Sequence, residues 1–166
     1  MDIKVVSYKE ENQENLQKMM FDFQKFMIHI DTWKVFKFDK DYRDKATDEL
    51  LKNIKEKKGK VYLAKSGNDF IGYIAGYIVP NKKDFETYTW KRGYVDELYL
   101  EEKYRRLGIG KKLLGKIEDY FRSQKCDTIG FNALFANKNA LEFYGKLGFE
   151  KRSLFLSKAL NKKVKK

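Results

Sequence analysis

Residues 104–114 read Tyr-Arg-Arg-Leu-Gly-Ile-Gly-Lys-Lys-Leu-Leu and directly follow the strand-like run at 94–100. This order predicts a strand, a short glycine-bearing loop and a helix whose first turn is rich in backbone donors and cations. Gly108 and Gly110 have no Cβ, so a ligand can approach the main chain closely there. The free N–H groups and the positive end of the helix dipole would suit a pyrophosphate. The stretch is therefore interpreted as an anion-binding turn.

Two well-known phosphate-binding loops do not fit this spacing. A P-loop requires G-x-x-x-x-G-K-[ST], but Gly110-Lys111 is followed by a second lysine and the first glycine is missing. A dinucleotide-binding fingerprint requires G-x-G-x-x-G, and Leu113 stands at its third glycine. What remains is Arg105-x-x-Gly108-x-Gly110, a pattern that an ordinary strand-to-helix turn can also produce. The loop alone therefore does not identify its ligand.

Length and composition predict one globular domain. The chain has 166 residues, of which 42% are hydrophobic and 16% aromatic, which is enough for a buried core. Residues 1–160 are expected to form this domain, and the basic residues 161–166 a disordered tail. The first residues do not resemble a signal peptide and no run is long enough to span a membrane. A cytoplasmic protein without membrane contact is expected.

Metal and disulfide chemistry are not expected. Cys126 is the only cysteine and His29 the only histidine, which excludes an internal disulfide and a histidine-rich metal site. A single thiol agrees with a reducing cytoplasm. Both residues are interpreted as structural, and no metal cofactor is expected.

The positive charge of the chain has two explanations. Lys and Arg number 36 against 24 Asp and Glu, a formal net charge of +12. Such a charge favours polyanions, among them cofactor phosphates and nucleic acid. Abundant Lys, Asn, Ile, Tyr and Phe also indicate a usage bias that raises the charge without any partner. The bias is the preferred explanation for most of the charge, and nucleic acid is not favoured as a partner.

Hydrophobic periodicity predicts an alternating series of strands and helices. Strands are expected at 3–8, 60–65, 70–79, 93–100, 128–135 and 149–158, and helices at 16–30, 41–57, 110–121 and 137–146. The order is β-α-α-β-β-β-α-β-α-β. It predicts an α/β fold (α+β mixed) with a central mixed, mostly antiparallel sheet and helices on both faces.

Three separated motifs resemble the GCN5-related N-acetyltransferase (GNAT) family. They are Val95-Asp96-Glu97-Leu98-Tyr99-Leu100, the Arg105-x-x-Gly108-x-Gly110 loop, and Asn137-x-x-Ala140-x-x-x-Tyr144-x-Lys146-x-Gly148-Phe149. The third is close to the family signature N-x-x-A-x-x-x-Y-x-K-x-G-F. Together they cover roughly residues 60–158. The chain is identified as a member of this family, which implies a GNAT-like acyl-CoA N-acyltransferase fold.

The resemblance implies acetyl-CoA as the cosubstrate. In such enzymes the fourth and fifth strands splay apart, helped by a bulge in the fourth, and the pantetheine arm bonds to the free edge of the fourth. Carried over, the backbone of Leu98, Tyr99 and Leu100 is expected to hold the pantetheine, and Asn137 to cap its helix and bond a pantetheine amide. The pyrophosphate is expected to lie on backbone N–H groups, with added charge from Arg105. The residues expected to supply these N–H groups are Arg106, Leu107, Gly108, Ile109, Gly110 and Lys111.

The resemblance also implies direct attack of an amine on the acetyl thioester. The amine must be neutral to attack, so a nearby carboxylate is useful as a base, and Glu97 stands where many members have one. In a strand without a bulge, Asp96 and Glu97 point to opposite faces, so only one would reach the cleft. Tyr144, whose phenol stays protonated at neutral pH, is expected to give a proton to the departing thiolate. Each of these side chains also has a purely structural explanation, such as pairing with a lysine or packing on the sheet.

The acceptor amine is left open by the sequence. It can be a small metabolite, a polyamine, an aminoglycoside-like compound or a protein amine. The site is expected between the first helices, the aromatic connection 31–39 and the loop 81–90, whose aromatics fit a cationic acceptor, the core or a homodimer interface equally well. Two competing hypotheses are a catalytically idle acyl-CoA-binding module, which would bind CoA without turnover, and a basic nucleic-acid binder with salt-dependent affinity.

Overall fold

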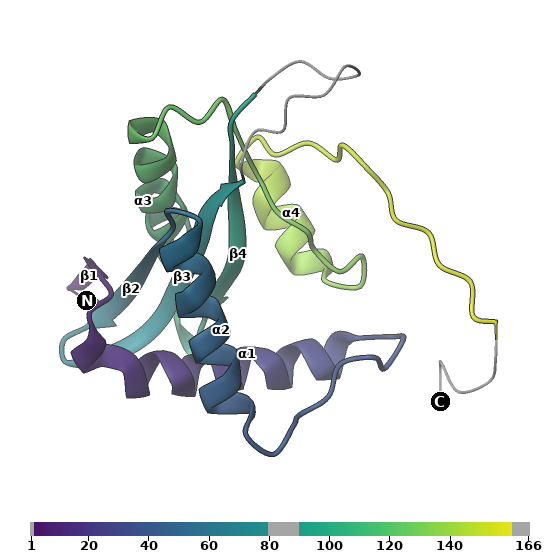
Figure 1. Ribbon diagram of the computed structural model, residues 1–166, viewed down its shortest axis with the longest axis horizontal. Coiled ribbons are helices and arrows are strands. Elements are labelled where there is room, and N and C mark those ends of the chain that lie inside the picture. The colour runs from purple at the N-terminus through teal and green to yellow at the C-terminus, as the bar shows by residue number, and fades with distance from the viewer. Residues whose placement is uncertain (1, 80–89, 161–166) are drawn as a thin grey trace. The chain divides into compact units, whose positions relative to one another are not determined.

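A computed structural model describes residues 2–79 and 90–160 (Figure 1). It forms two compact units, Met1–Phe21 with Asp41–Phe131, and Asp22–Lys40 with Asn132–Lys166. We call them the first and second unit and describe each separately. The helices are α1 (Gln13–Ile30), α2 (Tyr42–Glu56), α3 (Ile109–Ser123) and α4 (Lys138–Lys146). The strands are β1 (Ile3–Ser7), β2 (Lys60–Ser66), β3 (Asp69–Val79), β4 (Arg92–Leu100) and β5 (Thr128–Gly130).

The first unit is built on a five-stranded sheet in the order β1-β2-β3-β4-β5. The first three pairs are antiparallel, and β4 pairs with β5 in parallel. The β2–β3 hairpin closes between Ser66 and Asp69, in the gap between the strands predicted at 60–65 and 70–79. The predicted mixed, mostly antiparallel sheet is therefore confirmed.

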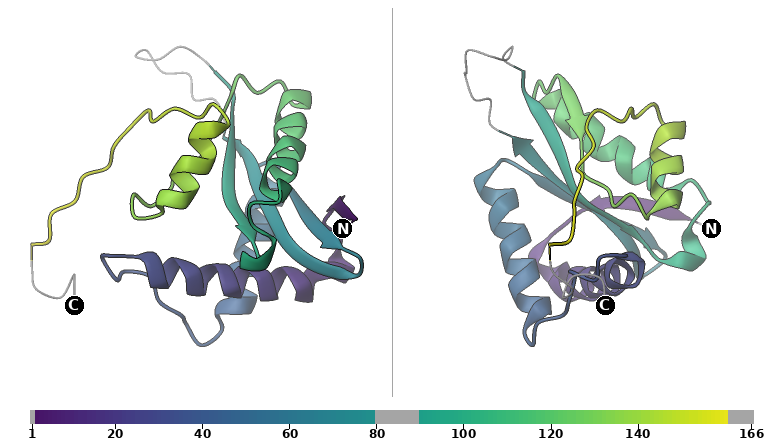
Figure 2. Two further views of the ribbon diagram at one scale, coloured as in Figure 1. Left: turned by 180° about the vertical axis from the view of Figure 1, so that it is seen from behind. Right: turned by 90° about the vertical axis from the view of Figure 1, so that its right-hand side faces the viewer.

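Helices cover both faces of this sheet, as predicted. Figures 1 and 2 show α2 and α3 on opposite sides of the strands. On the α3 face, a Cβ added to Gly93 of β4 would lie 2.3 Å from the Phe121 ring, so glycine there allows close packing of α3. On the other face, the ammonium of Lys57, just after α2, lies 4.4 Å from the centre of the Tyr77 ring of β3.

The apolar face of α3 fixes this helix on the sheet. Its buried residues follow the predicted helical spacing; they are Ile109, Leu113, Leu114, Ile117 and Phe121. At the far end, the Tyr120 hydroxyl donates a 2.7 Å hydrogen bond to the carbonyl of Lys58, in the α2–β2 connection. Because both ends are anchored in the first unit, the N-terminus of α3 has a defined place beside the end of β4.

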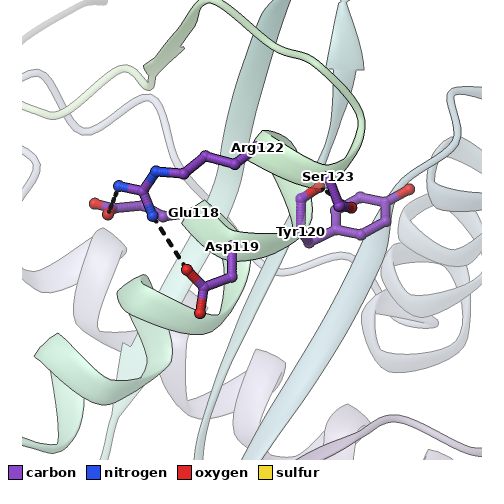
Figure 3. Close-up of polar contacts among 5 residues, drawn as sticks. All are labelled: Glu118, Asp119, Tyr120, Arg122 and Ser123. Atoms are coloured by element: carbon purple, nitrogen blue, oxygen red, sulfur yellow. Dashed lines mark hydrogen bonds and ion pairs between the residues drawn. The ribbon is translucent and has the colours of Figure 1, made fainter.

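The last turns of α3 carry polar contacts at the protein surface (Figure 3). Arg122 pairs with Glu118 at 2.9 Å and with Asp119 at 3.1 Å. The Ser123 hydroxyl donates to the Tyr120 carbonyl at 2.7 Å. Since exposed ion pairs contribute roughly 0–1 kcal/mol each, the apolar face contributes most to the stability of α3.

Two strand predictions are wrong. The fifth strand, expected at 128–135, ends at Gly130 after three residues. The final strand expected at 149–158 is not formed, because the described residues of that segment pair with no strand and Leu154, Phe155 and Leu156 are exposed. A run of alternating apolar residues can join a sheet only where another strand has a free edge. The local sequence does not show whether such an edge exists. The last strand of the predicted element order is therefore absent.

Parts of other predictions fall outside the described residues. These are residues 81–89 of the acceptor loop expected at 81–90 and the tail 161–166. Within residues 2–79 and 90–160, no helix combines the length and apolar character needed to cross a membrane.

Candidate active site

A bulge in β4 determines which way its two carboxylates point. Ala75 of β3 lies opposite Glu97, and the next residue of β3, Gly76, lies opposite Val95, so Asp96 has no opposite residue. A bulge of this kind reverses the alternation of side chains beyond it. Asp96 and Glu97 therefore both lie on the α2 face. The family resemblance implies a bulge in this strand, and with the bulge present the condition under which only one of the two carboxylates would reach this side does not apply.

The Glu97 carboxylate is held by a buried tyrosine. The hydroxyl of Tyr73, on the neighbouring β3, donates a 2.5 Å hydrogen bond to Glu97 Oε2. Burial raises the pKa of Glu97 to about 7, against the lowering effect of the Tyr73 hydrogen bond and with a smaller raising effect of Asp96. A carboxyl group with this pKa can both accept and release a proton near neutral pH.

Aromatic side chains surround this carboxylate. Tyr73 is 0% exposed, and its ring centre lies 6.1 Å from that of Tyr99. Burial, together with the charge of Glu97, raises the pKa of Tyr42 at the start of α2 to about 12. The same two causes raise the pKa of Tyr73 well above its usual value. Both phenols therefore stay protonated while Glu97 titrates.

Asp96 lies closer to solvent and to α2. Burial raises its pKa, the ammonium of Lys57 lowers it, and the carboxylate of Glu49 raises it. Asp96 is nevertheless exposed in the fold. Glu97 is thus the better placed of the two to keep a raised pKa and act as a base.

One edge of β4 is open beyond its first residues. β5 pairs only with Arg92, Gly93 and Tyr94. In the described part of the chain, no other strand lies along that edge up to Leu100. This agrees with the splayed strands that the family resemblance implies.

The ladder with β3 shows which backbone groups point to the open edge. A Cβ on Gly72 would lie 2.6 Å from the Tyr99 carbonyl oxygen, so that carbonyl points toward β3. Because backbone groups alternate along a strand, those of Leu98 and Leu100 point the other way. The Leu100 carbonyl accepts a 3.0 Å hydrogen bond from Arg105 Nε. Of the three predicted pantetheine-binding residues, Leu98 and Leu100 therefore face the open edge.

The glycine loop forms a turn with exposed N–H groups. Arg106 (φ +64°) and Gly108 (φ +77°) are left-handed, and α3 starts at Ile109 with no side-chain cap. The first bond of the helix runs from Lys112 N–H to the Gly108 carbonyl at 3.1 Å. The N–H groups of the three residues before Lys112 therefore have no acceptor inside the helix. Left-handed residues followed by a helix start make a concave group of N–H donors that suits phosphate.

Space and charge at this loop also fit a pyrophosphate. A Cβ on Gly108 would meet no atom within 4 Å, so the main chain is open on that side. Arg106 and Lys111 are exposed cations next to the N–H groups. The predicted residues of this loop thus come together at the N-terminus of α3, next to the end of β4.

The other two predicted residues lie in the second unit. Asn137 caps α4, its side-chain oxygen accepting a 3.2 Å hydrogen bond from the Ala140 N–H, as predicted. Tyr144 lies in α4, with its ring centre 5.6 Å from that of Phe149 in an edge-on arrangement. Burial raises the pKa of Tyr144, so the phenol is a proton donor and not a phenolate at neutral pH.

Three residues that organise the site or its surroundings were not predicted from the sequence. Tyr73 and Tyr42 lie near Glu97 only because of strand register and helix packing, which the sequence does not show locally. Asp31, in the connection 31–39, is 5% exposed and accepts the backbone N–H groups of Trp33, Val35 and Phe36 at 2.9, 2.6 and 3.2 Å. An Asp directly after a helix and before an irregular segment is a signal that could have identified this turn.

No metal site is found in the part of the chain that the structure describes: no three His, Cys, Asp or Glu side chains are grouped there as ligands.

Comparisons with known proteins point the same way. The family model described as "Acetyltransferase (GNAT) family" matches residues 26–149. N-alpha-acetyltransferase 30 of Xenopus laevis is 35% identical over 88 residues, which are 53% of this chain and 30% of that protein. Thialysine N-epsilon-acetyltransferase of Sus scrofa is 28% identical over 82 residues, 49% of this chain and 45% of that protein. The chain thus spans less than half the length of these two curated relatives.

Solved structures share the fold over nearly the whole chain. A mutant of the BH1408 protein from Bacillus halodurans superposes with a TM-score of 0.84 at 17% identity, covering 97% of this chain and 100% of that chain. The aminoglycoside N-acetyltransferase AAC(6')-Iy in complex with CoA gives a TM-score of 0.70 at 14% identity, covering 95% of each chain. At these identities the likeness shows a shared fold.

Proposed function

The chain belongs to the GNAT acetyltransferase family, and on this basis we propose that it transfers the acetyl group of acetyl-CoA to a primary amine. The observation that carries the proposal is Glu97, a carboxyl group with a pKa of about 7 on the strand whose open edge leads to the glycine loop. A base tuned to neutral pH is what deprotonation of an amine requires.

Binding of the cosubstrate is assigned to backbone groups. The N–H groups of Ile109, Gly110 and Lys111 would hold the pyrophosphate, with Arg106 adding charge. The backbone of Leu98 and the N–H of Leu100 would bond the pantetheine along the open edge of β4. The relative of known structure that binds CoA has the same fold, which supports this assignment.

The proposed reaction is a single displacement. Glu97 accepts a proton from the acceptor ammonium, directly or through water, which leaves the nitrogen lone pair free. The nitrogen then bonds to the acetyl carbonyl carbon, and the bond from that carbon to sulfur breaks. Tyr144 donates a hydrogen bond and then its proton to the departing sulfur. The acylated nitrogen loses its remaining extra proton at the same time, and this proton restores the Tyr144 phenol, so no phenolate is left. The products are an N-acetylated amine and CoA.

From the sequence we also propose residues 1–160 as one acetyltransferase domain, with Asn137 capping α4 and bonding the pantetheine. A cytoplasmic location is part of the proposal and is supported by the single thiol, Cys126. A homodimer stays compatible with the exposed aromatic and aliphatic side chains of the second unit, such as Phe155.

The acceptor is proposed only as a primary amine. By their names, the relatives act on N-terminal amines, on thialysine and on aminoglycosides, so family membership covers both protein and small-molecule acceptors. The carboxylates of Glu97 and Asp96, which lie on one face of the sheet, favour an acceptor that arrives as a cation.

The test is a thiol-release assay with acetyl-CoA against a panel of peptide N-termini, lysine analogues, polyamines and aminoglycosides. Release that depends on one class of amine, with a matching acetylated product by mass spectrometry, supports the proposal. Tight CoA binding without release on any amine would instead support the idle acyl-CoA-binding module.

A further inference from the structure

The buried hydroxyl of Tyr73 contacts Glu97 and is not accessible to a substrate. Tyr73 lies opposite Tyr99, and Glu97 lies opposite Ala75, so Tyr73 and Glu97 are diagonal neighbours on the α2 face. Tyr73 is 0% exposed, and its hydroxyl donates to Glu97 Oε2 at 2.5 Å. A substrate cannot touch a side chain buried to this extent.

The hydrogen bond from Tyr73 opposes the other influences on the pKa of Glu97. The groups that face it are Tyr73 on β3, Tyr42 on α2 and the neighbouring Asp96 on β4, with Tyr99 beside Tyr73. Burial and Asp96 both raise the pKa of Glu97, whereas the hydrogen bond from Tyr73 lowers it. Tyr73 itself has a raised pKa, so it stays a donor over the whole range in which Glu97 titrates.

We propose that Tyr73 is a positioning residue for acetyl transfer, whose phenol binds Oε2 of Glu97 and thereby turns Oε1 toward the acceptor amine. The inference rests on the proposed function and extends it to a residue that touches neither substrate. Without this bond the carboxyl group would be free to rotate, and more of it would be protonated at neutral pH.

The test is Tyr73→Phe, which removes the hydroxyl and keeps the ring. The acidic limb of the pH–rate profile should move to higher pH by about one unit, which lowers kcat at pH 7 about fivefold. The rate should recover only in part at pH 9, because the deprotonated carboxylate is still free to rotate, and the KM for acetyl-CoA should not change. A profile that superposes on that of the wild type would overturn the proposal, as would an equal loss of rate at every pH.

The matched control is Tyr77→Phe. Tyr77 lies on the same strand and the same face, against Lys57 and Tyr94 and away from the Glu97 carboxylate. The Tyr77→Phe substitution removes a phenol hydroxyl in the same way and should leave the acidic limb of the pH–rate profile at its wild-type pH. A shift of similar size in this variant would show that any lost phenol on β3 has the effect, and would count against a special role for Tyr73.

A second substitution keeps the proposal testable if Tyr73→Phe does not fold. Incorporation of 3-fluorotyrosine at position 73 keeps the shape and makes the phenol a stronger donor, so the acidic limb should move downward. An unchanged or raised limb would contradict the proposal.

A measurement without turnover separates this inference from the proposed function. In carbon-13 NMR of the glutamate carboxyl groups, one group should titrate near pH 7 in the wild type and at higher pH in Tyr73→Phe. An unchanged titration overturns the role of Tyr73. Absence of acetyl transfer by the wild type with every acceptor, despite that titration, overturns the proposed function.

Discussion

At the scale of single residues, Glu97 makes the folded protein less stable as the pH rises. Its pKa is raised from 4.5 in a free side chain to about 7 in the fold. The native state therefore binds more protons than the unfolded state between these two values, and the free energy of unfolding falls as pH rises through this window. Because the side chain is only partly buried, we place the effect at about 2 kcal/mol.

The first prediction is that Glu97→Gln increases stability at alkaline pH. The amide does not titrate and can still accept the Tyr73 hydrogen bond. The variant should match the wild type in free energy of unfolding near pH 4.5 and exceed it by about 2 kcal/mol at pH 8. Urea titrations at the two pH values measure this difference. A constant difference at both would mean that the carboxyl group is not perturbed.

The second prediction concerns Tyr144. Tyr144→Phe removes the proposed proton donor and keeps the ring that packs against Phe149. We expect kcat to fall by about 10²-fold while the Kd for CoA, measured by calorimetry, stays the same. Equal losses in kcat and in CoA affinity would make Tyr144 a binding residue.

Sequence reasoning at this scale found the residue types but not their contacts. Glu97 and Tyr144 were identified through motifs. The shared face of Asp96 and Glu97 depends on the bulge opposite Ala75 and Gly76, which follows from pairing between strands. Tyr73 looks like any core residue of an apolar strand until the register places it next to Glu97.

At the scale of elements, the start of α3 depends on a left-handed residue. The third prediction is that Gly108→Ala destabilises the fold by about 1 kcal/mol, because φ is +77° there and an L-residue is strained in that region. A Cβ would meet no protein atom, so the same methyl group should project into the pyrophosphate site and weaken CoA binding. Thermal unfolding and calorimetry with CoA measure the two effects.

Gly115 provides the control for that substitution. It lies inside α3 with open space around its Cβ position, so Gly115→Ala should stabilise the fold by about 0.5–1 kcal/mol and leave the CoA affinity unchanged. If both substitutions weaken CoA binding equally, the loop does not hold the pyrophosphate.

The connection after α1 depends on one carboxylate. Burial alone would raise the pKa of Asp31, but hydrogen bonds from backbone N–H groups hold it below its usual value. The stability that it contributes is therefore present above the unfolded-state pKa and is lost as pH falls through the lower native value. The fourth prediction is that Asp31→Ala speeds hydrogen exchange at the amides of Trp33, Val35 and Phe36.

The exposed Asp22, which pairs with Lys25 on α1, is the matched control for this experiment. Asp22→Ala should leave those three amides protected at pH 7. Unchanged exchange in Asp31→Ala would show that the segment is ordered by other contacts.

Local periodicity predicted the helices well and the last strands poorly. The buried face of α3 and the cap of α4 are encoded within a few residues each, so spacing and cap chemistry were sufficient. A strand at 149–158 would have needed a partner along its whole length, and apolar alternation does not state which partner exists. For the same reason the early end of β5 could not be predicted.

At the scale of the whole molecule, the sequence predicted the fold class and family more reliably than the acceptor. The three motifs between Val95 and Phe149 agreed in order with the family, and the first two lie in the first unit, along β4 and at the start of α3. The acceptor site proposed from the sequence involves several segments, among them the loop expected at 81–90, and the strand register around Glu97. None of these is specified by a short motif.

The central claim, acetyl transfer with Glu97 as the base, is tested most directly by the pH dependence of kcat/KM in the thiol-release assay. For the wild type we predict an acidic limb near pH 7 that stays in place when acceptors of different amine pKa are compared. Glu97→Gln should lose that limb and about 10²-fold in rate while still binding CoA. Amine-dependent release by Glu97→Gln at the wild-type rate, with the limb unchanged, would contradict the claim.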